Sequence, residues 1–188
     1  MNARIAFGLA AVFLLLGLML PLWFTHMEAP QYKGDEALNV RVYADHVEGD
    51  LDEIRLLNRY VGVVLPKDFS ELDVAPWVIG ALLLLAAAGA AVPGNLRRWV
   101  GAVLLVGFVV CAFAGTQLLH QRLHALGHER TPSAFARIDD FMPPLIGTAK
   151  IANFTVHTGI GPGGWALGSA FGLSVCGVFM AFRRREHR

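Results

Sequence analysis

Residues 151–182 read IANFTVHTGIGPGGWALGSAFGLSVCGVFMAF, and this stretch decides the fold that the sequence predicts. It contains no Asp, Glu, Lys or Arg, yet a helix needs only about 20 residues to cross a bilayer. We therefore expect a crossing helix at 161–182 and an interfacial segment at 151–160. Gly164, Gly168 and Gly172 recur every four residues, and this spacing favours close helix packing within the chain over a dimer contact.

Three more apolar runs precede this stretch, at 5–24, 76–92 and 99–119. The chain of 188 residues is 55% hydrophobic and 16% charged, whereas soluble domains carry about 25% charged residues. The first run follows Arg4 as in a signal peptide, but its length and the lack of a small-residue cleavage site favour a retained helix. The sequence thus predicts an all-α integral membrane protein with four transmembrane helices, one for each apolar run.

The basic residues in the short flanks of the apolar runs all fall on one side if there are four spans. The positive-inside rule places this side, with both termini, in the cytoplasm of a bacterial inner membrane. Residues 25–75 and 120–160 then share the periplasmic face. The net charge of +1 gives no sign of a basic surface for nucleic acid, so the expected partners are the lipid bilayer and other membrane or periplasmic proteins. The flanking residues are Arg4, Arg97, Arg98, Arg183, Arg184, Arg185 and Arg188.

Residues 25–75 form the only long polar segment, and we expect a small α+β extracytoplasmic cap there, between the first two helices. Residues 38–44 alternate apolar and polar side chains, which predicts a half-buried strand. Asp50 and Glu53 resemble a capping box that opens a short amphipathic helix, and Gly62 is placed to end it.

The histidines and methionines are the side chains that most readily bind a metal here. His120, His124 and His128 recur every four residues, so they share one face if the third helix continues past the membrane. Imidazole together with thioether sulfur suits copper, although contact with solvent or lipid headgroups is the simpler interpretation of His120 and His124. The predicted metal ligands are His26, Met27, His128, Met142 and His157. HExxH, CxxC and CxxCH motifs are absent, so we do not expect an enzyme.

Four short motifs resemble those of a family of small four-span membrane proteins: EAPQY (28–32), LNRYVGV (57–63), LGH (126–128) and PPLIGTAKIANF (143–154). Genes of that family often accompany those for nitrous oxide reductase maturation and copper handling. The resemblance therefore implies an accessory role in copper handling or in assembly of a copper-containing respiratory enzyme. Arg59 and Val63 stand where the family has His and Met, which weakens a metal site on the short helix. The matching residues expected in structural or docking roles are Glu28, Tyr32, Asn58, Tyr60, Pro143, Pro144, Gly147 and Asn153.

Three functions stay open at this point. A copper-handling accessory protein predicts that His128, His157 and a methionine converge on one point. A scaffold or accessory subunit without a metal predicts histidines that point apart and an apolar outer groove. A haem- or quinone-binding subunit needs histidines within the spans, and only His157, at the interface, comes close. We also expect Glu28 to pair with Arg122, Arg137 or Lys150.

Overall fold

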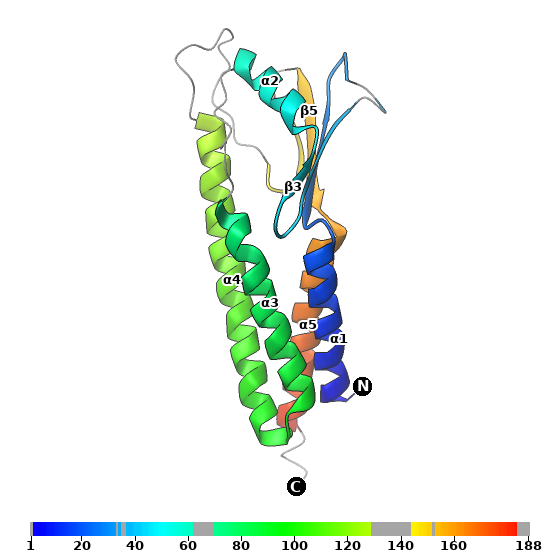
Figure 1. Cartoon of the computed structure of the whole chain (residues 1–188), viewed down its shortest axis with the longest axis vertical. Helices are drawn as coiled ribbons and strands as arrows, with labels where there is room; N and C mark the ends of the chain where they lie inside the picture. The colour runs from blue at the N-terminus through cyan, green and yellow to red at the C-terminus, as the bar shows by residue number, and fades with distance from the viewer. Residues whose placement is uncertain are drawn as a thin grey trace.

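A computed structural model describes residues 2–32, 34, 37–61, 70–128, 144–151 and 153–183 of the chain (Figure 1). The expected strand after residue 38 and the expected helix after Asp50 are both confirmed. Asp50 precedes that helix, but its side-chain carboxylate accepts a hydrogen bond from the backbone N–H of Asn39. In chain order the elements are α1 (Ala3–Met19), β1 (Trp23–Glu28), β2 (Leu38–Val42), β3 (Val47–Gly49), α2 (Leu51–Val61), α3 (Ser70–Ala91), α4 (Gly94–His128), β4 (Gly147–Ile151), β5 (Phe154–Ile160) and α5 (Pro162–Arg183).

The five strands form one antiparallel sheet with the order β3-β2-β1-β5-β4. The expected all-α class is therefore wrong, and so is the expected cap built from residues 25–75 alone. The segment 151–160, expected to lie at the interface, supplies strand β5, which pairs with β1 on one side and β4 on the other. Hydropathy does not separate an apolar strand from the end of an adjoining helix, and this is why the prediction failed.

The first apolar run is also not one helix. Helix α1 ends at Met19, and Leu20 is already extended, with φ −110° and ψ 153°. Pro21 is the cause, because a proline disfavours helical geometry in the residue before it. The rest of the run crosses over to β1. At 17 residues α1 rises about 25 Å, short of the roughly 30 Å of bilayer hydrocarbon.

Three of the described helices are long and apolar enough to cross a membrane: Leu72–Ala91 within α3, Asn95–Ala125 within α4, and α5. The protein is thus a membrane protein, but the expected class of four spanning helices is not what the structure shows. Trp77 and Trp165, near the sheet ends of α3 and α5, are 81% and 67% exposed, and Trp99 at the other end is 69% exposed. Tryptophans are enriched at both membrane–water interfaces, and the positions of these three side chains near the helix ends agree with that preference.

A close backbone contact joins the helices to the sheet. The turn from α1 to β1 lies directly against the turn from β5 to α5. The backbone N–H of Gly161 donates to the carbonyl oxygen of Leu22, and that of Gly163 donates to the carbonyl oxygen of Pro21, both at 2.9 Å. A Cβ on Gly163 would lie 2.3 Å from the carbonyl oxygen of Leu20, a distance that real Cβ atoms do not show. The sequence GPGG (161–164) is therefore required for this approach. In Figure 1, β1 and β5 continue upward from α1 and α5, which run side by side.

Phe7 lies where the four long helices meet, in the part of the bundle away from the sheet. Its side chain is fully buried, and its ring contacts a glycine on each of the three other long helices. A Cβ added to Gly89, Gly101 or Gly177 would lie 3.1, 2.8 or 3.1 Å from the Phe7 ring. Gly177 is thus one of the small residues that pack α5 against the other helices. The expected Gly168 and Gly172 are not, because an added Cβ at either would meet no atom within 4 Å.

Arg97 fixes the turn between α3 and α4. Its side chain is 5% exposed, and its Nε donates to the carbonyl oxygen of Gly89 at 2.8 Å while the guanidinium also donates to Val92. A cation bound to the last carbonyls of a helix stabilises that helix end. Arg98 lies 5.6 Å from the centre of the Phe182 ring and so links this turn to the end of α5. In Figure 1 the turn lies at the end opposite the sheet, together with the start of α1 and the end of α5.

The glycine contact at the junction gives a direct test. We expect Gly163→Ala to lower the free energy of unfolding by about 1–3 kcal/mol, because the new methyl group forces the backbone at Leu20 to move. Thermal unfolding of the purified protein in detergent measures this change. Gly172→Ala is the matched control on the same helix and leaves the melting temperature unchanged or slightly raised, since its methyl group meets no atom. Equal melting temperatures for the two variants would contradict the argument.

Candidate functional site: the histidine face of the sheet

One face of the sheet gathers most of the polar side chains of its strands. Successive side chains of a strand alternate between faces, so the strand register decides which residues lie together. His26 on β1 pairs with Asn39 on β2 and with His157 on β5, and His157 pairs with Thr148 on β4. We call this the histidine face, made of Phe24, His26, Glu28, Asn39, Arg41, Thr148, Lys150, Thr155 and His157.

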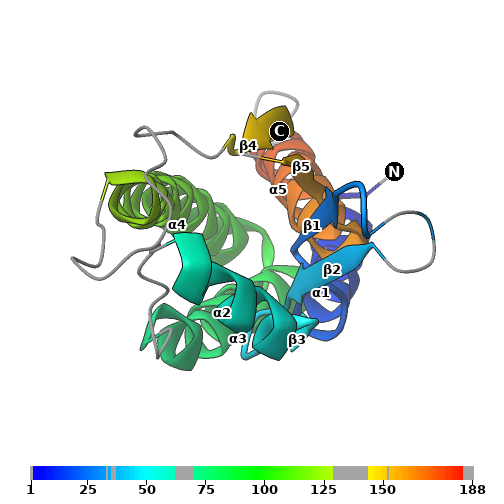
Figure 2. The ribbon, with the colours of Figure 1, turned by 90° about the horizontal axis from the view of Figure 1, so that it is seen from above.

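The opposite face is apolar and more buried. Leu38 and Val156 are 2% and 7% exposed there, and they share this face with Met27, their partner in both registers. On the histidine face Asn39, Arg41 and Phe24 are exposed, so this face is directed to solvent. Seen from above, α2 lies on the side of the sheet toward α4 (Figure 2).

His26 has both ring nitrogens bound to acceptors. Its Nδ1 lies 2.7 Å from Oδ1 of Asn39, and its Nε2 lies 3.2 Å from Oε1 of Glu28. The amide of Asn39 is oriented by its own donor, Nδ2, which donates to the carbonyl oxygen of Ala37 at 2.8 Å. Because the Asn39 oxygen and the Glu28 carboxylate can only accept here, both nitrogens of His26 are placed as donors, which is the hydrogen-bonding arrangement of the protonated ring.

The pKa of His26 agrees with this geometry. The hydrogen bond to Asn39 raises the pKa of His26 above its ordinary value, partial burial opposes this, and the hydrogen bond and negative charge of Glu28 raise the pKa further. Glu28 forms an ion pair with His26, which was not among its expected partners Arg122, Arg137 and Lys150; Arg137 lies outside the described residues.

His157 is the neighbour of His26 across the sheet. The two ring centroids lie 6.4 Å apart with the ring planes tilted by 35°. The Nδ1 atom of His157 lies 2.7 Å from the hydroxyl oxygen of Thr148. The histidine face thus carries two imidazoles next to each other, one of them protonated and held from both sides.

The predicted metal ligands are only partly brought together. His26 and His157 are neighbours, whereas Met27 lies on the opposite face. His128 is the last residue of α4 and stacks on His124, with ring centroids 3.9 Å apart. This end of α4 lies away from β5 in both views (Figures 1 and 2). Met142 lies outside the described residues. A copper site that includes His26 does not fit this arrangement, because neither ring nitrogen is free; copper binding by the chain stays a prediction.

The residues expected in structural roles are placed as follows. Tyr32 stacks on Phe154, with ring centroids 6.3 Å apart, so two separate motifs meet beside the sheet. The carbonyl oxygen of Pro144 accepts a hydrogen bond from the hydroxyl of Thr158 at 3.0 Å. Gly147 has φ +120°, a conformation that favours glycine. Asn153 lies in the tight turn between β4 and β5. Asn58 and Tyr60 lie on α2, while their side chains and Pro143 are outside the described part.

Asn39 and Thr148 were not identified from the sequence as site residues, although they orient the two histidines. The alternation of residues 38–44 identifies the strand that carries Asn39, but its partner becomes visible only from the register between β1 and β2. A second histidine with a raised pKa, His46, was also missed.

His46 lies in the turn between β2 and β3. Its Nδ1 lies 2.6 Å from Oδ1 of Asp45 and its Nε2 lies 3.2 Å from Oε1 of Glu48, and these carboxylates raise the pKa of His46.

No protein-family model matches this chain, and no curated protein is significantly similar to it. The resemblance found in the four motifs therefore stays a prediction. The function is argued from the geometry of the described residues.

The raised pKa of His26 predicts a pH-dependent stability. A raised pKa in the folded state adds stability that is fully present below the pKa of the unfolded chain, about 6.5, and is lost as the pH rises through the folded-state value. We therefore expect the melting temperature to fall as the pH rises through this window. In the His26→Gln variant the melting temperature falls less over this pH range, and the remaining fall comes mainly from His46. His120→Gln, on the exposed outer part of α4, is the control and keeps the wild-type profile. An unchanged profile in His26→Gln would contradict the assignment.

Proposed function

We propose that this protein is an accessory protein of the bacterial inner membrane that holds the histidine face outside the bilayer as a docking surface for another membrane or periplasmic protein. The observation that carries this proposal is the junction at Gly161–Gly164. It joins the sheet to α1 and α5 through backbone hydrogen bonds, without a flexible linker on either side. A surface mounted in this way keeps a fixed height and orientation above the membrane, as docking requires.

The charge distribution supports an extracytoplasmic sheet. Arg4 opens α1, Arg97 and Arg98 lie at the turn between α3 and α4, and Arg183 ends α5, all at the end of the helices opposite the sheet. Short flanks rich in Lys and Arg face the cytoplasm. With this orientation both ends of the described chain are cytoplasmic and the histidine face is periplasmic.

The composition of the histidine face suits binding to a protein. Phe24 is 42% exposed and lies over Gly159, and Arg41 is its partner on β2. Aromatic and arginine side chains contribute much of the affinity in protein interfaces. His26 and Glu28 form an ion pair, so the surface offers one exposed aromatic ring beside a row of polar groups, with no uncompensated charge at that pair. No metal is needed for this role.

Copper handling, which the resemblance implies, is the alternative role of the same accessory protein. The described residues offer two pairs of adjacent imidazoles in its favour, His26 with His157 and His124 with His128, but His26 is already bound on both nitrogens and the two pairs lie apart. We therefore favour a docking surface that works without a metal.

The orientation is tested by labelling of single cysteines in intact cells. Cys111 and Cys176 are first replaced by serine, and one cysteine is then placed at Glu48 on β3 or at Asn95 at the start of α4. We expect a membrane-impermeant maleimide to label the Glu48→Cys protein in spheroplasts, and the Asn95→Cys protein only after the membrane is permeabilised. The reverse pattern would overturn the periplasmic placement.

The docking surface is tested by photocrosslinking in the native membrane. A benzophenone amino acid replaces Phe24 or Arg41 on the histidine face, and Leu56 on α2, which is 55% exposed, serves as the control position. We expect a discrete crosslinked protein of higher mass from the first two positions and none from Leu56. Equal yields from all three positions, or no crosslink from the histidine face when the protein is at its native level, would contradict the proposal.

A further inference from the structure

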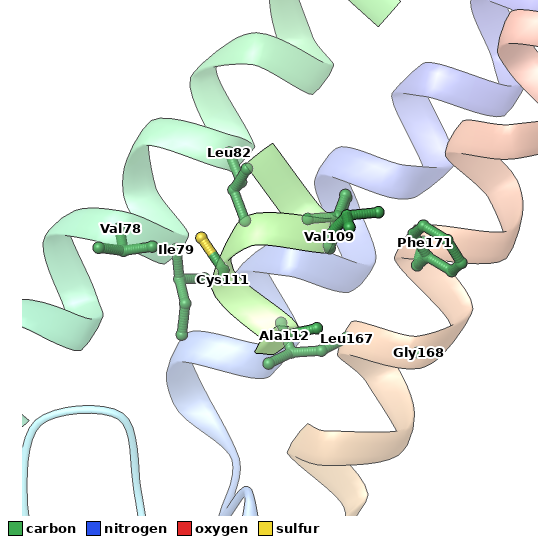
Figure 3. Close-up of a pocket in the computed structure, with 10 residues that line it drawn as sticks. Val78, Ile79, Leu82, Val109, Cys111, Ala112, Leu167, Gly168 and Phe171 are labelled. Carbon is green, nitrogen blue, oxygen red and sulfur yellow. The ribbon is translucent and has the colours of Figure 1, made fainter. Parts of the chain in front are cut away.

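A cavity lies among the helices in the half nearer the sheet. Its volume is about 470 Å³, and side chains from α3, α4 and α5 line it. Figure 3 shows Ile79 and Leu82 of α3 on one side and Phe171 of α5 on the other, with Cys111 of α4 between them. The lining residues of α3 and α5 belong to the first four turns of those helices, which begin at the sheet end. The cavity thus lies between the middle of the helices and their sheet end.

The cavity exists because α4 packs loosely and α5 has a glycine there. Only 6% of the apolar window of α4 is buried, compared with 22% for α3 and α5. Phe108 of α4 meets Phe171 edge to face, with ring centroids 5.6 Å apart, and this contact holds the two helices at a distance. Gly168 borders the cavity, and a Cβ at this position would meet no atom within 4 Å.

The chemistry of the lining selects an apolar occupant. Every lining side chain is aliphatic or aromatic, apart from the weakly polar thiol of Cys111. A polar ligand would lose its hydration there without gaining hydrogen bonds, which costs several kcal/mol in general. The volume lies within the roughly 300–1,000 Å³ range of small-molecule sites. Two of the lining side chains, Val109 and Phe171, are 58% and 40% exposed, so the cavity is open on one side and an apolar occupant can enter it from outside.

We propose that this cavity binds one acyl chain of a membrane phospholipid, taken from the leaflet on the side of the sheet. The cavity lies between the helices that are long enough to cross the membrane, so its opening is continuous with the surface that lipid covers. Val106 and Val109 of α4 show this continuity: Val106 is 62% exposed on the outer surface, and Val109, 58% exposed, also lines the cavity. This inference does not depend on the docking function proposed above.

Two glycines of α5 provide a matched pair of variants. Gly168→Leu places a side chain in the cavity without a clash, because nothing lies within 4 Å of the added Cβ. Gly172→Leu places the same side chain one turn further along, also without a clash, at a residue that does not line the cavity. Both proteins are compared with wild type by thermal unfolding, so that a folding defect is recognised. Ala112→Leu on α4 fills the cavity from the other side and replaces Gly168→Leu if that variant is unstable.

The full-length protein is reconstituted in vesicles of phosphatidylethanolamine and phosphatidylglycerol that contain a phosphatidylethanolamine with a diazirine in one acyl chain. After irradiation, the labelled residues are identified by mass spectrometry. We expect labels on Ile79, Leu82 and Cys111 in wild type and in Gly172→Leu, and their loss in Gly168→Leu, while labels on the outer residues Val106 and Phe179 persist in all three. Labels confined to the outer residues in wild type, or cavity labels that persist in Gly168→Leu, would overturn the proposal.

Discussion

The contact between two turns, Leu20–Leu22 and Gly161–Gly164, is the constraint on which the rest of the structure depends. Here the backbones approach until no side chain fits between them, and hydrogen bonds join the carbonyl oxygens of Pro21 and Leu22 to the N–H groups of Gly163 and Gly161. One turn leads from helix α1 to strand β1 and the other from strand β5 to helix α5, and the two turns lie side by side. As a result α1 packs on α5 below the contact, and β1 pairs with β5 above it.

This geometry explains why the histidine face is so regular. The register of β1 and β5 is set where the two turns meet, at Trp23 and Ile160, and it continues residue by residue to His26 opposite His157. Asn39 and Thr148 then lie on the outer sides of the two rings. A protonated imidazole that bridges β1 and β2 adds a charge-assisted contact across this pair of strands, and such bonds are stronger than neutral ones.

The sequence predicts the elements whose pattern is local and misses those that depend on partners far away in the chain. Strand 38–42 and helix 51–61 follow from alternation and from helical spacing, and the three long spans follow from hydropathy. Strands β1 and β5 adjoin apolar helices, so hydropathy joins them to the spans, although Pro21 and the β-branched residues of β5 were available as signals. His26 and Met27 were grouped as neighbours in sequence, whereas alternation in a strand separates them onto opposite faces. The pairing of His26 with His157 needs a register that no local pattern contains.

The pairing of the first and last elements also sets the order in which the chain can fold during its synthesis. Strand β1 can pair with β2 as soon as residue 42 has left the ribosome, but its other edge stays open until β5 is made, more than a hundred residues later. An open strand edge is a template for pairing with other chains. The nascent protein therefore passes through a stage in which α1 lacks its main packing partner and the sheet is only half complete, and synthesis of the GPGG turn ends that stage.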